Sequence, residues 1–149
     1  MTVHHFEPTR YYRTIGSHAP ALLVNDGDTV ETTTVDARGQ DASGRQIAPP
    51  GNPMTGPFYV RGAEPGDTLE VTLDKLTPNR PYGWSRKMVA PNVVEPESVP
   101  LLPWPPDEAH ALASWQVNAE AGTATLADPA GTSVGALRLP IRPMVGCFG

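Results

Sequence analysis

The fold is decided by residues 51–73, which read GNPMTGPFYVRGAEPGDTLEVTL. Two Pro/Gly turns bracket a short apolar run at residues 58–60, and residues 68–73 then alternate polar and apolar side chains. Alternation of this kind is typical of a β-strand with one buried face. The stretch therefore predicts a strand at 58–60, a tight turn, and a second strand at 68–73.

The turn Glu64-Pro65-Gly66-Asp67 has a physical mechanism. Proline presets φ at the first central position and glycine supplies the positive φ of the second, which is the pattern of a type II turn. We expect the Asp67 carboxylate to accept nearby backbone N–H groups and close the turn. The pattern Gly-Asp-Thr-(Val/Leu)-Glu also occurs at residues 27–31. It indicates either an internal repeat or a common way to begin a strand.

Composition places the chain among globular β-rich proteins. Its 149 residues are 39% hydrophobic and 18% charged, which fits one domain spanning residues 1–149. The 18 prolines and 14 glycines are spread along the chain and favour short strands and turns over long helices. We predict an all-β fold, a sandwich of mainly antiparallel strands with little helix. Further strands are expected at residues 2–6, 11–14, 29–35, 113–118, 124–126 and 136–141, a loop at 76–85, and a helical turn or two at 107–113.

Charge and hydropathy exclude several classes of function. The net charge is −5 and no cluster of Lys or Arg exceeds two neighbours, so nucleic acid is not an expected partner. The apolar runs are too short to span a membrane, and the N-terminus lacks the layout of a signal peptide. A single cysteine, Cys147, fits a reducing compartment and a cytoplasmic protein. We interpret Cys147 as a small buried cysteine rather than a nucleophile, because no histidine is near it in sequence.

A polar loop follows the strand expected at 29–35. The carboxylates of Glu31, Asp36 and Asp41 lie within eleven residues, and the amide of Asn52 follows. Oxygen-rich sets of this kind suit a hard cation, or position a water and an amide N–H. The spacing matches no defined metal loop, so a solvated polar loop is the alternative interpretation.

Three further features have two interpretations each. His18 lies in a turn and is either a loop histidine or a substrate-binding residue that faces a partner. Trp84 beside Gly83 either lines a small-substrate pocket or covers the edge of a core. The Pro-rich strap at residues 90–106, which contains Trp104, resembles a polyproline II ligand in composition, or is a buried strap without regular structure.

The central run, together with residues 140–149 (PIRPMVGCFG), resembles the acetamidase/formamidase family of amide hydrolases. Members of that family carry a Thr/Ser-Gly-Pro element, a Val-x-Gly-Ala-Glu-Pro-Gly-Asp stretch, and a later Pro-Met-x-Gly-x-x-Gly stretch that runs on into Val-Ala-Pro. The resemblance covers nearly the whole chain, including residues 27–30 and 35–37. It implies a β-sandwich fold and hydrolysis of small linear amides to a carboxylate and ammonia.

The resemblance also implies site residues. The family shares the Glu-Thr…Asp-Ala pattern of Glu31 and Asp36, so we expect these two to be catalytic. Asn52, Trp84 and His18 are the candidates for substrate binding. Many family members carry a histidine near the position of Asn52, and its absence here weakens a metal-ligand role at that position.

The second half of the family's fold implies a partner chain. It carries a His-Gly-Gly-Asn-x-Asp motif and a Gly-Asp-x-His-Ala-x-Gln-Gly-Asp-Gly-Glu motif, and neither occurs in these 149 residues. We therefore expect this chain to be an N-terminal half that is inactive alone, with most catalytic groups on a complementary C-terminal chain from the same precursor or gene. A divalent metal ion, zinc or calcium, is expected to have its ligands mainly on that chain. Open sheet edges also predict a homo-oligomer. The alternative is a non-catalytic β-rich protein-interaction module.

Overall fold

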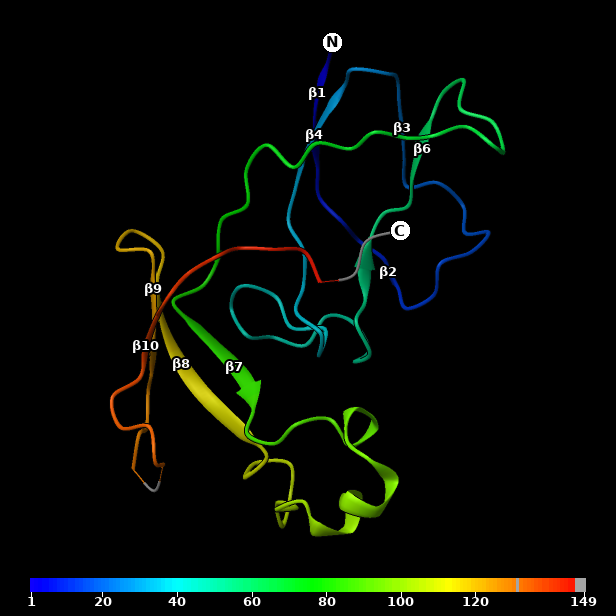
Figure 1. Cartoon of the computed structure of the whole chain (residues 1–149). Helices are drawn as coiled ribbons and strands as arrows, with labels where there is room; N and C mark the ends of the chain where they lie inside the picture. The colour runs from blue at the N-terminus through cyan, green and yellow to red at the C-terminus, as the bar shows by residue number, and fades with distance from the viewer. Residues whose placement is uncertain (131, 147–149) are drawn as a thin grey trace. The chain divides into compact units, whose positions relative to one another are not determined.

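A computed structural model describes residues 1–130 and 132–146 of the chain (Figure 1). These residues divide into two compact units, one made of Met1–Lys75 with residues 145 and 146, the other of Leu76–Met144. The β-rich character predicted from the sequence is confirmed, and Cys147 lies outside the described residues. The elements are β1 (Val3–Phe6), β2 (Tyr11–Tyr12), β3 (Leu22–Val24), β4 (Thr29–Thr32), β5 (Met54–Thr55), β6 (Phe58–Val60), β7 (Tyr82–Arg86), η1 (Pro91–Val93), η2 (Pro96–Leu101), β8 (Leu112–Asn118), β9 (Thr123–Leu126) and β10 (Arg138–Pro140).

Three two-stranded ladders organise the first unit. β1 pairs with β4 and β3 pairs with β6, both in parallel, while β2 and β5 are antiparallel. The two parallel ladders depart from the prediction of mainly antiparallel strands, which holds in the second unit. β4 ends earlier than predicted, and beyond it the Thr33 carbonyl accepts a hydrogen bond from the Thr55 hydroxyl at 3.1 Å.

The two Gly-Asp turns are built in the same way. Each aspartate donates its N–H to the carbonyl three residues earlier, Asp28 to Asn25 at 3.1 Å and Asp67 to Glu64 at 3.0 Å. Each carboxylate accepts the N–H of that same residue, at 3.0 and 2.8 Å. Gly66 has a φ of +106°, which meets the need for positive φ at this position. The predicted closure of the turn by Asp67 is confirmed.

The prediction of a second strand at residues 68–73 is wrong. Residues 68–73 form no strand with any described segment, and Leu69, Val71 and Leu73 are 57%, 56% and 52% exposed. By contrast Thr29–Thr32, which follows the equivalent first turn, pairs with β1. Alternation specifies an extended segment, but a strand also needs a neighbour for its backbone groups.

The second unit contains a four-stranded antiparallel sheet in the order β10-β9-β8-β7. Three of its strands confirm the predictions at 113–118, 124–126 and 136–141. Residues 82–85, predicted to lie in a loop, belong instead to strand β7. β7 takes its register from β8, with Tyr82 opposite Gln116 and Trp84 opposite Ser114. The turn-forming residues before Tyr82 indicate a loop, and so the short strand after them was not predicted.

Alternation gives the sheet one polar and one apolar face. Directly opposite residues share a face, so Gln116, Thr125 and Arg138 form a polar row across β8, β9 and β10. Trp115 is opposite Leu126 on the other face, and the Trp115 indole N–H donates to the Ser85 hydroxyl at 2.9 Å.

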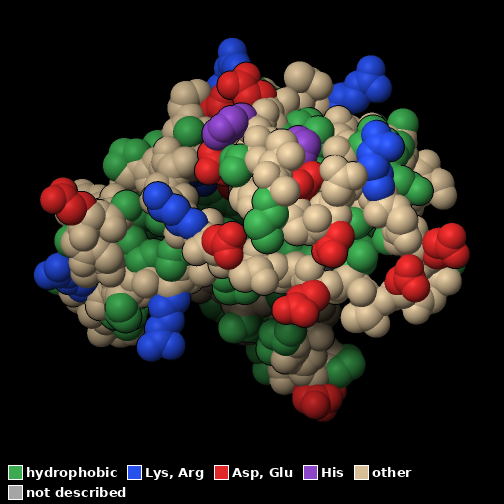
Figure 2. Space-filling view, turned by 90° about the horizontal axis from the view of Figure 1, so that it is seen from above, with side chains coloured by type: hydrophobic (Ala, Val, Ile, Leu, Met, Phe, Trp, Pro, Cys, Tyr) green, Lys and Arg blue, Asp and Glu red, His purple; other side chains and the backbone are tan. Residues whose placement is uncertain are grey.

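Few apolar side chains are buried. Among the described residues the buried hydrophobic ones are Val24 and Ala48 in the first unit and Ala111 and Leu126 in the second. Hydrophobic side chains are visible at the surface between polar ones in Figure 2. The exposed ones include large residues such as Leu101 and Met144.

The Pro-rich strap is neither buried nor without regular structure. Residues 90–106 contain two 3-10 helices, η1 and η2, each with proline in its first turn, where the missing N–H has no cost. Neither helix has a buried residue, and Leu101 and Trp104 are 83% and 54% exposed. After the strap, Asp107 caps a turn by accepting the His110 N–H at 2.9 Å, although no helix forms there. Within the described part of the chain, no helix has the length and hydrophobicity to cross a membrane.

Candidate functional site

Glu31 lies on β4, directly opposite His5 of β1. The Glu31 Oε2 atom is 2.9 Å from His5 Nδ1, and the two side chains are 62% and 77% exposed. A carboxylate on one ring nitrogen of histidine favours the tautomer that leaves the other nitrogen free as a proton acceptor. The strand pairing thus brings the predicted Glu31 carboxylate into contact with a histidine.

The preceding histidine, His4, is held by Asp28 in the first Gly-Asp turn. The Asp28 carboxylate lies 3.1 Å from His4 Nε2 and also accepts the backbone N–H groups of Asn25 and Thr2, at 3.0 and 2.7 Å. The Asn25 N–H, then His4, then Thr2 hold the pKa of Asp28 well below the usual range of a carboxyl. Its side chain is only 3% exposed, so Asp28 ties β1 to the turn before β4.

Asp36 organises the polar loop after β4. Its Oδ1 atom accepts the N–H groups of Arg38 and Gln40, both at 2.9 Å. Asp41 repeats the pattern five residues later, accepting the N–H groups of Ser43 and Arg45 at 2.9 and 3.0 Å. The Ser43 hydroxyl, the backbone N–H groups and the Arg45 charge together lower the pKa of the Asp41 carboxyl. The two carboxylates therefore close successive tight turns, which explains their spacing.

Asn52 lies where this loop returns to β5. It is the non-glycine residue with positive φ in the described part of the chain, at 56°, and its N–H donates to the Ala37 carbonyl at 3.1 Å. Ala37 follows Asp36 directly, so the structure brings Asn52 close to the turn that Asp36 closes. Asparagine tolerates this backbone conformation better than most residues.

His18 packs beside the same ladder. Its ring stacks on Tyr12 with centroids 3.9 Å apart, and Tyr12 pairs with Met54, two residues after Asn52. The His18 Nε2 atom lies 3.0 Å from the Thr14 carbonyl and 3.1 Å from its hydroxyl. Neighbouring Tyr11 has a raised pKa, from partial burial and from the negative charge of Asp41. This strand and the polar loop are therefore close together.

The predicted residues thus fall into separate places. Asp36, Asn52 and His18 surround the β2–β5 ladder and its loop, whereas Glu31 pairs with His5 on the β1–β4 ladder. Trp84 belongs to the second unit, where it is half-buried on β7. Sequence reasoning missed His5, because a pairing between distant parallel strands leaves no local signal.

Comparison with known proteins identifies no relative of this chain. No family model, curated protein or solved structure matches this chain. The chemistry of the site therefore rests on its own residues and distances.

The described residues offer little for a metal ion. In residues 1–130 and 132–146, no three His, Cys, Asp or Glu side chains gather closely enough to hold one. Asp36 and Asp41, the carboxylates that favoured a hard cation, are directed to backbone N–H groups of their own turns. The expected zinc or calcium ion, with its ligands mainly on a complementary chain, stays a prediction.

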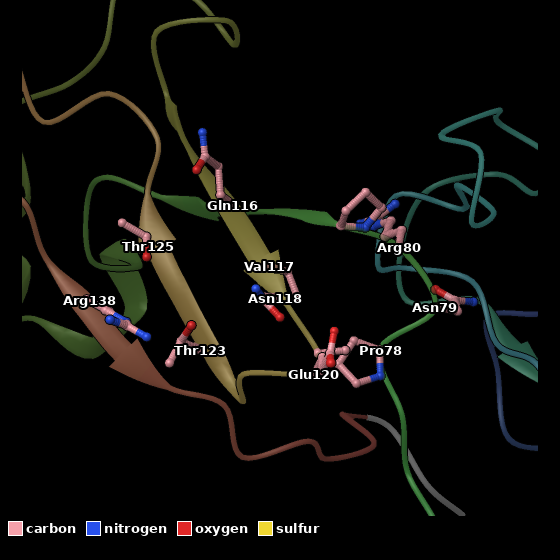
Figure 3. Close-up of a pocket in the computed structure, with 12 residues that line it drawn as sticks. Pro78, Asn79, Arg80, Gln116, Val117, Asn118, Glu120, Thr123, Thr125 and Arg138 are labelled. Atoms are coloured by element: carbon pink, nitrogen blue, oxygen red, sulfur yellow. The ribbon is translucent and has the colours of Figure 1, made fainter.

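The second unit has an open hollow of about 1030 Å³ (Figure 3). Gln116 and Asn118 of β8, Thr123 and Thr125 of β9, and Arg138 of β10 line it from the sheet. The loop at residues 78–81 lines it as well. Trp84 is not among the lining residues, so its predicted role as a pocket wall does not apply to this hollow.

Proposed function

We propose that this chain is part of a cytoplasmic amidohydrolase that cleaves small linear amides, of the formamide and acetamide type, to a carboxylate and ammonia. The resemblance of residues 51–71 and 140–149 to the acetamidase/formamidase family supports the reaction class. The observation that carries the proposal is the 2.9 Å contact between His5 and Glu31, since Glu31 is one of the two predicted catalytic residues. A β-sandwich completed by a second chain belongs to the same proposal.

The pair supplies acid–base chemistry for amide hydrolysis. In that reaction the oxygen of a water bonds to the carbonyl carbon, the water loses a proton, and the C–N bond breaks as nitrogen gains one. With Nδ1 directed to Glu31, the Nε2 atom of His5 takes the proton from water and returns it to the leaving nitrogen. Glu31 stabilises the transient imidazolium and fixes the orientation of the ring.

The other predicted residues have supporting places in this proposal. Asp36 holds the loop that returns at Asn52. Asn52 and His18 stay predicted substrate-binding residues on either side of the β2–β5 ladder. Trp84 remains a predicted substrate-binding residue. The remaining catalytic groups, and a zinc or calcium ion, are assigned to the complementary C-terminal chain, so no step here is assigned to a metal.

The test is ammonia release by the protein purified under native conditions. Glu31→Gln removes the charge that orients His5, and we expect activity on formamide and acetamide to fall about 100-fold, in the range that acid–base groups contribute. Glu7→Gln removes a carboxylate from another exposed position of the first unit and serves as the matched control. Equal activity of the two variants would refute the role of the pair.

One observation favours a second function, a protein-interaction module. Leu101 and Trp104 of the Pro-rich strap are 83% and 54% exposed, and the Trp104 indole N–H donates to the Val99 carbonyl at 3.1 Å. The hydrogen bond holds the ring against the strap in a fixed orientation, as an aromatic anchor for another protein requires. This function predicts a stable chain without amidase activity.

A further inference from the structure

Residues 68–75, here called the free strand, read TLEVTLDK and follow the second Gly-Asp turn. Every residue of the free strand is exposed, and within the described part of the chain no backbone hydrogen bond joins it to another segment. Its apolar residues Leu69, Val71 and Leu73 share one face, because alternate residues of an extended chain do. It therefore combines an apolar stripe with backbone groups that have no hydrogen-bond partner among the described residues.

An exposed segment with these two properties is a template for another strand. We propose that the free strand pairs with the free strand of a second copy of this chain, antiparallel and about a two-fold axis at Val71. A two-fold interface requires that each residue and its partner exchange roles between the two copies. Every antiparallel register about a two-fold axis meets this condition, so the side chains decide between the registers.

In the proposed register Val71 is opposite Val71 and Leu69 is opposite Leu73, so all three apolar residues meet apolar ones. Just beyond each end of the ladder, Asp67 in the turn of one copy comes opposite Lys75 of the other, which places opposite charges together while Asp67 keeps its bonds to Glu64. Glu70 meets an uncharged threonine, Thr72.

The alternative registers are worse in charge or in packing. A two-fold axis at Glu70 places two glutamates directly opposite each other, and an axis at Thr72 places Glu70 opposite Asp74. Like charges at opposite positions destabilise a sheet. A shift by one residue sets the apolar face of one strand against the polar face of the other. Charge and alternation thus select the axis at Val71.

Disulfide trapping tests the register. In a Cys147→Ser background, Val71→Cys places two thiols directly opposite each other, where the Cα separation of an antiparallel pair, about 4.5–5.5 Å, lies within the range of a disulfide. We expect a covalent dimer of twice 15.9 kDa after mild oxidation. Leu69→Cys in the same background is opposite Leu73 and should stay monomeric under denaturing conditions. Equal cross-linking of both variants, or of neither, would overturn the proposed register.

Sedimentation velocity tests the association itself. Val71→Lys sets two lysines on the axis, and we expect the dissociation constant to rise about tenfold or more. Val134→Lys changes a valine of the same 56% exposure in the second unit and should leave association unchanged. Thr68→Lys faces Asp74 of the second copy in this register and should tighten the dimer. The proposal would be overturned if the wild-type chain stayed monomeric at 100 times the lowest concentration that the measurement detects. It would also be overturned if this strand bound a different polypeptide.

Discussion

Replacing Gly39 by alanine should open the loop that Asp36 closes. Gly39 has a φ of +79°, and a Cβ atom there would lie 2.1 Å from the Ala48 carbonyl oxygen, which is backbone and has little room to move. The carbonyl of Gly39 also accepts the N–H groups of Ile47 and Ala48, at 2.9 and 3.1 Å. The left-handed conformation costs a non-glycine residue about 1–2 kcal/mol. Two lost hydrogen bonds add about 0.5–1.5 kcal/mol each. The sum is a destabilisation of the loop by about 2–5 kcal/mol.

Two control glycines separate these contributions. Gly62 also has positive φ, at +83°, but a Cβ there meets nothing within 4 Å, so Gly62→Ala reports the conformational cost alone. Gly16 has neither constraint, and Gly16→Ala should change stability by less than about 0.5 kcal/mol.

Hydrogen exchange measured by mass spectrometry is the suitable assay. All three tryptophans lie in Leu76–Met144, so their fluorescence does not report on this loop. The amides of Ile47 and Ala48 should lose protection in Gly39→Ala and keep it in Gly62→Ala. If Gly39→Ala costs no more than Gly62→Ala, the close approach of Gly39 to Ala48 is refuted.

Three further changes test, in turn, the Asp28 carboxylate, the burial of Leu126 and the hydrogen bond of Trp115. Because the pKa of Asp28 is lowered on folding, its stabilising effect is present above the ordinary carboxyl pKa of 3.8 and is lost as the pH falls through the lower folded value. Unfolding followed by circular dichroism should therefore be more acid-sensitive in the wild type than in Asp28→Asn. Leu126→Ala, at a position 8% exposed, should cost about 2–5 kcal/mol in urea unfolding, and Leu139→Ala, 43% exposed on the same sheet, clearly less. Trp115→Phe should cost about 1 kcal/mol through loss of the bond to Ser85, and the change should be near zero in a Ser85→Ala background.

Local chemistry made the turns predictable. Pro65 and Gly66 fix the backbone within four residues, and the Asp67 carboxylate closes the same turn, so nothing distant is needed. Alternation over residues 113–118 likewise predicts strand β8 to within one residue of its observed start. Predictions failed where a partner strand decides the outcome. Residues 68–73 have the pattern of a strand but no described neighbour, and β7 gains its strand structure from β8.

The same distinction applies to the site. The roles of Asp36 and Asp41 follow from hydrogen bonds to residues two and four positions later, a spacing that a close reading of the loop can suggest. The partner of Glu31 depends on a parallel pairing of β1 with β4, which no local pattern encodes. His5 is therefore a residue that only the three-dimensional arrangement could assign.

Native mass spectrometry joined to an ammonia assay tests the central claim most directly. The proposed amidohydrolase predicts that the natively purified sample contains this 15.9 kDa chain bound to a second, different polypeptide, and that the same sample releases ammonia from formamide or acetamide. A sample that contains only this chain, alone or as a dimer of two copies, and that releases no ammonia would contradict the account.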